Sequence, residues 1–211
     1  MNRLRYNRQQ AVEYLRSHCD PLGQFINRHG ELELKVRREH DLFNALSRAI
    51  VYQQLSGKAA STIHGRFSGL FENEIPEAEQ AGALSMEQLR SVGLSRNKAL
   101  AVQDLAAKTL DGSLVTMRRM ARMDDGQLIE NLCSVRGVGP WTAQMLLIFN
   151  LGRPDVMPAT DLGVQKGVQA IYRMRKLPSP DQVLRKTRHL SPYRSAASWY
   201  FWRAADTELL T

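Results

Sequence analysis

The stretch LCSVRGVGPWTAQMLLIF, residues Leu132–Phe149, places a glycine-rich turn between two helical segments. Gly137 and Gly139 bracket one valine, and Pro140 follows, where its fixed φ suits the first turn of a helix. Glycine can adopt positive φ, and the amides of such a turn, beside the positive end of the next helix, favour an anion such as a DNA phosphate. An ordinary tight corner between two helices is the alternative. The stretch predicts a helix-hairpin-helix unit over residues 125–149.

The composition is that of a folded globular chain with an excess of basic residues. Its 211 residues are 43% hydrophobic, and 29 lysines and arginines against 21 acidic residues give a net charge of +8. This excess is compatible with a nucleic-acid partner and with ordinary solubilising charge. The two cysteines, Cys19 and Cys133, exclude a zinc site or iron–sulfur cluster held by four cysteines.

From the sequence, we expect neither a secretion signal nor a membrane-spanning segment. The first ten residues, MNRLRYNRQQ, lack an apolar core, and the longest apolar run, Met145–Phe149, is too short to cross a bilayer. The scarcity of cysteine fits a reducing compartment. We therefore expect a protein of the cytosol, or of the nucleus in a eukaryote, with no membrane partner.

Helical periodicity dominates the chain and predicts an all-α fold. Residues suited to cap helices precede several segments with apolar residues at spacings of three and four. These caps are Asp41, Ser85, Ser95, Asp124 or Asp125, and Asp161, with Ser179-Pro180 and Ser191-Pro192 at two further helix starts. Glu31–Val36 alternates in polarity, but it is short and charged, so we expect a loop or a minor extended piece.

The string VRGVGPWTAQMLLIFNLGRPDVMPATDLGVQKG, which begins at Val135, closely resembles the core of the helix-hairpin-helix DNA glycosylase superfamily. Its best match is the alkylbase branch, the DNA-3-methyladenine glycosylases II. Ala49–Phe67 and Leu89–Ala106 agree with the same branch in order and spacing. The resemblance therefore covers most of residues 42–175.

The resemblance implies two helical lobes with a cleft between them, in one compact unit over residues 1–211. We expect lobe A at about residues 1–40 plus 175–211 and lobe B at about residues 41–174. The first 40 residues leave no room for the N-terminal β domain of the longer bacterial relatives, so the resemblance implies a compact member.

Asp161 matches the essential aspartate of the superfamily, within the string PATDLG. Breaking a purine N-glycosidic bond develops positive charge on the deoxyribose, which a carboxylate can stabilise while it orients a water. A purine alkylated at N3 or N7 is already cationic, so one carboxylate can suffice. Aspartate is also a favoured helix cap, and the two roles are compatible. Asp155 is the nearby alternative, in a context typical of a loop.

Trp141 occupies the position where relatives that also cut the DNA strand carry a lysine, two residues after the second hairpin glycine. This departure implies a monofunctional enzyme, and the resemblance as a whole implies a monomer that acts on damaged double-stranded DNA. It would flip out 3-methyladenine, 7-methylguanine or ethenoadenine and hydrolyse the N-glycosidic bond, leaving an abasic site. One alternative is a non-enzymatic DNA-binding protein that uses only the helix-hairpin-helix contacts. Another is a glycosylase of the same superfamily that has lost the function of the aspartate or acts on oxidised bases.

The resemblance also implies a base pocket and a DNA-contacting surface. A flipped cationic purine favours an aromatic wall. Candidates for the pocket are Trp141, Met145, Gln53, Tyr52 and Trp199, with core packing as the alternative for the aromatics. Candidates for DNA contact are Gln54, Leu55, Ser56, Lys58, Lys98, Gly137, Gly139 and Thr142. A solvated surface charge is the alternative for both lysines.

No cofactor is expected. The resemblance implies a structural Na⁺ or K⁺ site at the hairpin, on the backbone carbonyls of Cys133, Val135 and Val138. The ligands of such a site would be backbone oxygens.

Overall fold

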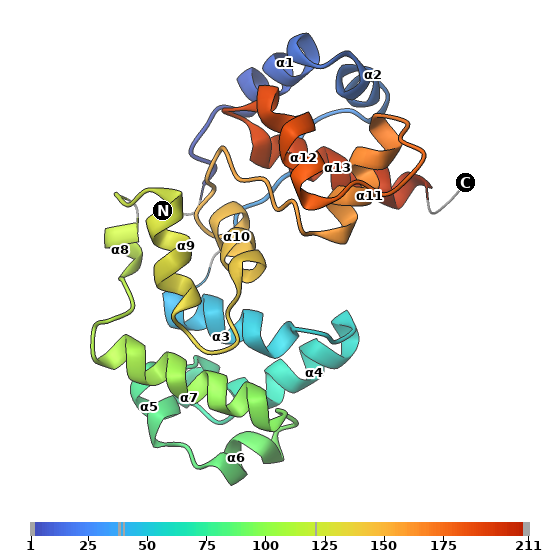
Figure 1. The fold of residues 1–211 in the computed structure, drawn as a ribbon. Helices are drawn as coiled ribbons and strands as arrows, with labels where there is room; N and C mark the ends of the chain where they lie inside the picture. Colours follow the sequence, from blue (N-terminus) through green and yellow to red (C-terminus); the bar gives the residue numbers. More distant parts are fainter. Residues whose placement is uncertain (1–2, 38, 40, 121, 209–211) are drawn as a thin grey trace. The chain divides into compact units, whose positions relative to one another are not determined.

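The computed structural model describes residues 3–37, 39, 41–120 and 122–208, and every regular element in these ranges is a helix (Figure 1). The predicted all-α class is therefore confirmed. The chain divides into two compact units. Unit 1 consists of Met1–Arg37 and Leu147–Thr211, and unit 2 is Arg38–Leu146.

Unit 1 is built from helices of both chain ends. They are α1 (Arg8–His18), α2 (Asp20–His29), α11 (Leu162–Ile171), α12 (Pro180–Thr187), the 3-10 helix η2 (Arg188–Leu190) and α13 (Arg194–Glu208). α11 and α13 pack closely along each other. The core of this unit includes the fully buried side chains of Leu15, Ile26, Val168 and Phe201. Burial of such large apolar groups provides most of the stabilisation of the unit.

Unit 2 holds the central part of the chain. Its helices are α3 (Leu42–Tyr52), α4 (Gly57–Ser68), the 3-10 helix η1 (Glu72–Glu74), α5 (Ala78–Ala83), α6 (Met86–Ser91), α7 (Arg96–Leu110), α8 (Met117–Met120), α9 (Asp125–Cys133) and α10 (Pro140–Phe149), whose last residues belong to unit 1. α7 packs against α3 and α5. Leu46, Ile50, Phe67 and Leu105 are fully buried there.

Most predicted caps are confirmed. The side chains of Asp41, Ser95, Asp124 and Asp161 each accept a hydrogen bond from a backbone N–H of the first turn, and Ser85 and Ser179 form capping boxes. The expected cap at Ser191-Pro192 is wrong, because α13 begins at Arg194. The stretch Glu31–Val36 has no regular structure, as expected.

Helices α1 and α2 were not among the predicted elements. In α1, only Ala11 and Leu15 are buried, so its apolar stripe is too narrow to produce a clear helical period. In α2, Pro21 and Gly23 interrupt the pattern. Both helices depend on packing against the rest of unit 1 more than on local preference.

The two units do not divide at the expected boundary. We placed residues 147–174 in lobe B, whereas the structure places Leu147–Thr211 in unit 1. The reason is the close packing of α11 on α13, where the backbone of Phe201 lies directly against Gly167. Asp161 therefore shares a unit with α13.

Candidate active site

Asp161 is held by two donors in unit 1. As the N-cap of α11, its Oδ1 accepts a hydrogen bond from the backbone N–H of Val164 at 2.9 Å. The same oxygen accepts a hydrogen bond from the indole Nε1–H of Trp202 on α13, at 2.8 Å. The carboxylate is half-buried. Two donors from different helices thus orient one side chain, and the capping role does coexist with a further contact.

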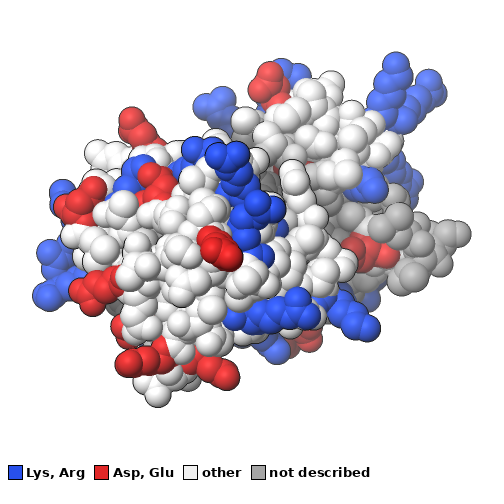
Figure 2. All heavy atoms as spheres, turned by 90° about the horizontal axis from the view of Figure 1, so that it is seen from below, with Lys and Arg blue, Asp and Glu red and all other residues white. Residues whose placement is uncertain are grey.

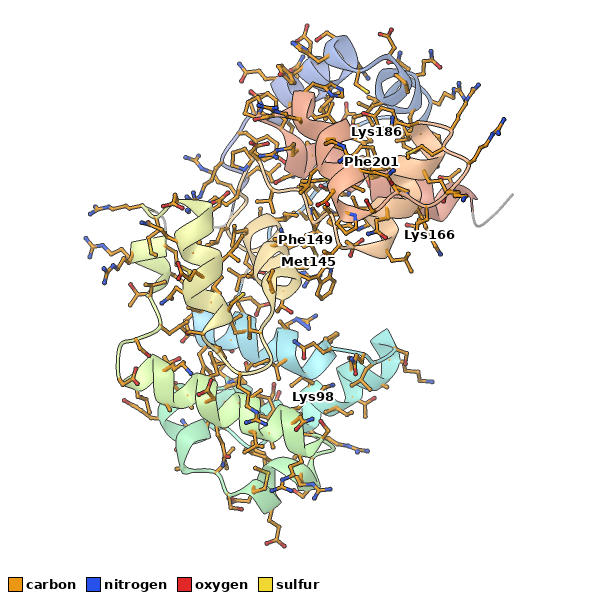
Figure 3. All side chains as sticks on the ribbon, viewed as in Figure 1. Lys98, Met145, Phe149, Lys166, Lys186 and Phe201 are labelled. Carbon is orange, nitrogen blue, oxygen red and sulfur yellow. The ribbon has the colours of Figure 1, made fainter. Side chains whose placement is uncertain are left out.

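An aromatic pair lies beside this carboxylate. The ring of Trp202 stacks on Phe149, with centroids 5.5 Å apart and planes at 27°. Phe149 lies at the end of α10 (Figure 3), and the guanidinium of Arg37 lies 5.3 Å from the centre of its ring. These groups all belong to unit 1. The site therefore presents a carboxylate next to an electron-rich aromatic surface.

Trp202 and Phe149 are absent from the predicted site residues. Phe149 ends the apolar run of α10 and looks like a core residue, while Trp202 is separated from Asp161 by 41 positions in sequence. A signal was nevertheless present in Gly163, which the PATDLG match contains. A Cβ at Gly163 would lie 2.8 Å from Trp202 Cδ1 and 3.1 Å from Asp161 Oδ1, so glycine leaves the space that the indole occupies.

The loop before Asp161 is tied to the start of α13. Arg194 donates to Asp155 from Nε at 2.7 Å and from NH2 at 2.8 Å, and Ser191 Oγ donates to the same carboxylate at 2.8 Å. Burial opposes ionisation, but these hydrogen bonds and the Arg194 charge outweigh it and lower the pKa of Asp155. Asp155, the alternative catalytic residue, is thus committed to a structural ion pair.

In unit 2, the predicted hairpin lies between α9 and α10, whose ends are Cys133 and Pro140. Gly137 has φ +75°, which an L side chain rarely adopts, and the Val138 N–H donates to the Val135 carbonyl at 3.0 Å. Val135 and Val138 are buried, whereas no atom lies within 4 Å of a Cβ built on Gly139. The helices and turn of the predicted unit are therefore present, with open space beside the second glycine.

Side chains from two other elements support the hairpin. Gln53 Nε2–H donates to the Gly137 carbonyl at 2.9 Å and reaches Thr142 Oγ1 at 3.5 Å. Asp104 on α7 accepts a hydrogen bond from the Arg136 N–H at 2.7 Å. Thr142, which we expected to contact DNA, is buried. The Thr142 side chain packs inside unit 2 and supports the hairpin from the interior.

Lys98, a predicted phosphate contact, makes two contacts within the protein that were not predicted. Its ammonium donates to the carbonyls of Val51 and Gln53, each at 2.8 Å, at the C-terminal end of α3 (Figure 3). Burial lowers the pKa of Lys98. A cation at the negative end of a helix is stabilising, and two carbonyls occupy its donors here. Lys58, by contrast, is exposed on the first turn of α4.

The remaining candidates have mixed surroundings. Tyr52 lies under the Arg48 guanidinium at 4.0 Å, and Trp199 lies 5.6 Å from the Arg203 guanidinium. Trp141 is 44% exposed on α10, and Met145, one turn later, is half-buried.

The loop between α3 and α4 contains the other predicted DNA contacts. Gln54 adopts φ +55° and Leu55 is 38% exposed, which suits a loop that meets a ligand. Ser56 caps α4 by accepting the Ala59 N–H at 3.4 Å.

Residues 3–37, 39, 41–120 and 122–208 contain neither a candidate membrane-spanning helix nor a candidate metal-binding cluster. None of the helices formed there has the length and apolarity to cross a membrane. The same residues bring together no group of three histidine, cysteine or acidic side chains suited to a metal ion.

Residues 47–192 match the family described as the HhH-GPD superfamily base excision DNA repair protein. DNA-3-methyladenine glycosylase 1 of Schizosaccharomyces pombe is 37% identical over 164 residues, which are 77% of this chain and 72% of the relative. The solved structure of an S. pombe 3-methyladenine DNA glycosylase in complex with abasic DNA has a TM-score of 0.83 at 33% identity, over 92% of this chain and 95% of that chain. A DNA-3-methyladenine glycosidase from Bacillus halodurans has a TM-score of 0.86 at 32% identity, over 95% of this chain and 91% of that chain. This chain belongs to the HhH-GPD superfamily of base excision DNA repair proteins.

Proposed function

We propose that this protein is a monofunctional DNA glycosylase that hydrolyses the N-glycosidic bond of alkylated purines. The observation that carries the proposal is the carboxylate of Asp161, oriented by Val164 and Trp202 beside the ring of Phe149. Family membership and relatives named DNA-3-methyladenine glycosylases support the same activity. The substrate class we propose is 3-methyladenine, 7-methylguanine and ethenoadenine in double-stranded DNA.

The chemistry follows from the charge that develops as the bond breaks. Positive charge grows on the deoxyribose in the transition state, and the Asp161 carboxylate stabilises it and orients the attacking water. The hydrogen bonds from Val164 and Trp202 hold the side chain in one rotamer, so little reorganisation is needed during the reaction. The products are the free base and an abasic site.

An aromatic wall gives the proposed preference for alkylated bases. Purines methylated at N3 or N7 carry positive charge, which stacking on an electron-rich ring favours. Trp202 and Phe149 supply such rings in unit 1, and the half-exposed Trp141 is the pocket candidate on α10. Cationic purines are also good leaving groups, which agrees with a site that has one assigned carboxylate.

The proposed DNA contacts lie on the hairpin and on the α3–α4 loop. The open space beside Gly139 lets a phosphate approach the amides of the turn, and the exposed Leu55 is suited to fill the gap left by a flipped base. Lys58 adds a cation near the same loop. A Na⁺ or K⁺ on the hairpin carbonyls is compatible with Val135, whose carbonyl accepts only the Val138 N–H among the backbone hydrogen bonds of this turn.

Two features separate the proposed reaction from its alternatives. A DNA-binding module would need the hairpin and basic residues but no oriented carboxylate next to an aromatic pair. A strand-cutting enzyme would need an amine at the position of Trp141 to form a Schiff base. We therefore propose base release without strand cleavage.

The test is base release from DNA containing 3-methyladenine, 7-methylguanine or ethenoadenine. Asp161→Asn keeps the acceptor oxygen for both donors but removes the charge, and we expect the single-turnover rate to fall by about 100-fold or more. Asp124→Asn is the matched control, since Asp124 is also an N-cap that accepts a backbone N–H, in unit 2.

Each outcome of this experiment has a defined consequence. No base release by the native protein, with DNA binding intact, would refute the enzyme. Equal rates for Asp161→Asn and Asp124→Asn would refute the residue assignment. A DNA adduct trapped by borohydride would refute the monofunctional reaction. Analytical ultracentrifugation, with and without DNA, tests the expected monomer.

A further inference from the structure

Charge is distributed unevenly between the two units. Unit 1 carries 17 lysines and arginines against nine acidic residues, whereas the 12 basic residues of unit 2 are balanced by 12 acidic ones. The whole net charge of +8 therefore belongs to unit 1. Figure 2 shows one face of the molecule, on which basic side chains form rows and acidic side chains gather mainly to one side.

Six exposed cations of unit 1 are close in sequence and are linked by one tyrosine. We call them the basic surface: Arg173, Arg175, Lys176, Arg185, Lys186 and Arg188. Tyr172 joins the two stretches, because its O–H lies 3.4 Å from the Lys186 carbonyl and its ring lies 5.1 Å from the Lys186 ammonium. Figure 3 labels Lys186 on α12. Between the stretches, the only acidic residue is Asp181.

Local helix chemistry explains only part of this surface. α12 buries Val183 and Thr187 and turns its basic residues outward, and cations in its last turn complement the helix dipole. The C-terminal end of α11 has the same effect on Arg173 beside it, but Arg175 and Lys176 lie further along the chain. None of the six cations forms an ion pair with the part of the chain that the structure describes. Six neighbouring like charges repel one another, and an anionic partner removes that repulsion.

We propose that the basic surface binds the phosphate backbone of duplex DNA away from the lesion, an inference that rests on the proposed function. Four of the six residues are arginines, whose planar guanidinium groups can donate two parallel hydrogen bonds to one phosphate. Leu177 and Leu184, each 43% exposed, lie in the same stretches and supply apolar contact for deoxyribose.

The length of α11 sets the distance between this contact and the reacting base. Asp161 caps the N-terminal end of α11, and the basic surface starts directly after its C-terminal end. A helix of ten residues is about 15 Å long. At about 3.4 Å per base pair, this length corresponds to roughly four base pairs, so we infer that the surface meets the backbone outside the lesion itself. The contact therefore requires flanking duplex.

The test compares a charge-reversed variant with a matched control on two lengths of DNA. The variant is Arg185→Glu/Lys186→Glu/Arg188→Glu. The control is Arg90→Glu/Arg118→Glu/Arg119→Glu, which changes the net charge by the same amount at exposed positions of unit 2. Fluorescence anisotropy measures affinity for duplexes of about 8 and about 24 base pairs with a central ethenoadenine, from about 50 to 200 mM salt.

We expect the variant to lose about 10- to 100-fold in affinity for the longer duplex. Its salt dependence should become shallower by two to three phosphate contacts, about 0.9 in slope for each. Binding to the short duplex and the single-turnover rate of saturated enzyme should stay within about twofold. Because glutamates can disturb folding, the triple glutamine variant is measured as well, and the melting temperature is checked for each protein.

Several results would overturn the proposal. These are an equal loss for the unit 2 control, an equal loss on both duplex lengths, or unchanged binding by the glutamate and glutamine variants. Loss of binding to phosphatidylserine vesicles with DNA binding intact would assign the surface to membranes instead. If the native protein releases no base, the proposed function fails, while affinity for undamaged duplex still tests the surface.

Discussion

Both units hold their functional loops with a carboxylate, but they present opposite polar groups. In unit 1, Asp155 ties the loop before Asp161 to Arg194, and in unit 2, Asp104 holds the Arg136 N–H of the hairpin. Unit 1 then orients an acceptor, the Asp161 carboxylate, with N–H donors. In unit 2 the occupied groups are acceptors, since side-chain N–H groups donate to backbone carbonyls around the hairpin.

The difference corresponds to the charge that each unit would meet. A developing cation needs an oriented anion, as in unit 1. A phosphate is favoured by available N–H groups, and in unit 2 Gln53 and Lys98 donate to the carbonyls of Gly137, Val51 and Gln53 itself. In each unit, hydrogen bonds within the protein occupy polar groups of one kind. The polar groups that stay available have the charge opposite to that of the proposed ligand.

The largest expected effect compares how closely one helix of each unit is packed. Gly167→Ala would place a Cβ against the Phe201 backbone, with its Cα at 2.6 Å, so α11 and α13 would have to separate. We expect a loss of more than about 4 kcal/mol of unfolding free energy. In unit 2, Gly65→Ala meets open space on α4 and should be neutral or stabilising by up to about 1 kcal/mol. Denaturant unfolding measures both, and similar values would contradict the packing argument.

The next effect tests whether the indole donor positions Asp161. Trp202→Phe keeps a ring to stack on Phe149 but removes the N–H, so the carboxylate loses one of two observed restraints. We expect a 10- to 100-fold lower single-turnover rate, about 1.4 to 2.7 kcal/mol in barrier. Trp199→Phe, on the same helix, serves as control, because the Trp199 ring pairs with Arg203. A greater loss for Trp199→Phe would reverse the assignment.

The third effect concerns the donors of unit 2. Lys98→Met leaves the carbonyls of Val51 and Gln53 without their cation, and we expect about 1 to 3 kcal/mol lower unfolding free energy. DNA affinity should fall while the excision rate of bound substrate is retained, since no reacting atom is involved. Lys58→Met removes an exposed cation and should leave stability unchanged. Equal stability of the two variants would show that Lys98 has no supporting role.

The smallest effect sharpens the parallel between the two anchoring carboxylates. The pKa values of Asp155 and Asp104 are lowered in the folded state, although burial opposes this, because hydrogen bonds and neighbouring cations favour the charge. A lowered pKa stabilises the fold above the unfolded value of about 3.9 and loses its effect as pH falls through the folded value. We expect Asp155→Asn and Asp104→Asn each to cost about 1 kcal/mol at pH 7.

This difference from the native protein should shrink below about pH 4. Chemical denaturation between pH 3 and pH 7 provides the measurement. A cost independent of pH would mean that the carboxylates act through packing instead of charge.

Sequence patterns alone predicted the helical class, most helix starts and the hairpin, and the resemblance to the glycosylase superfamily pointed to the candidate carboxylate. These features depend on neighbours in the chain: caps bond three residues ahead, as at Asp124, and Gly137 meets a local need for positive φ. The position of Asp161 before α11 follows from the same local chemistry.

The partners of Asp161 and Lys98 became apparent only in the folded structure. Trp202 reaches Asp161 across 41 residues, and Lys98 reaches α3 across more than 40, so neither contact leaves a local pattern. The boundary at Leu147 follows likewise from the packing of α11 on α13. Contacts between distant segments form only when apolar surfaces are buried together, and sequence spacing does not encode them.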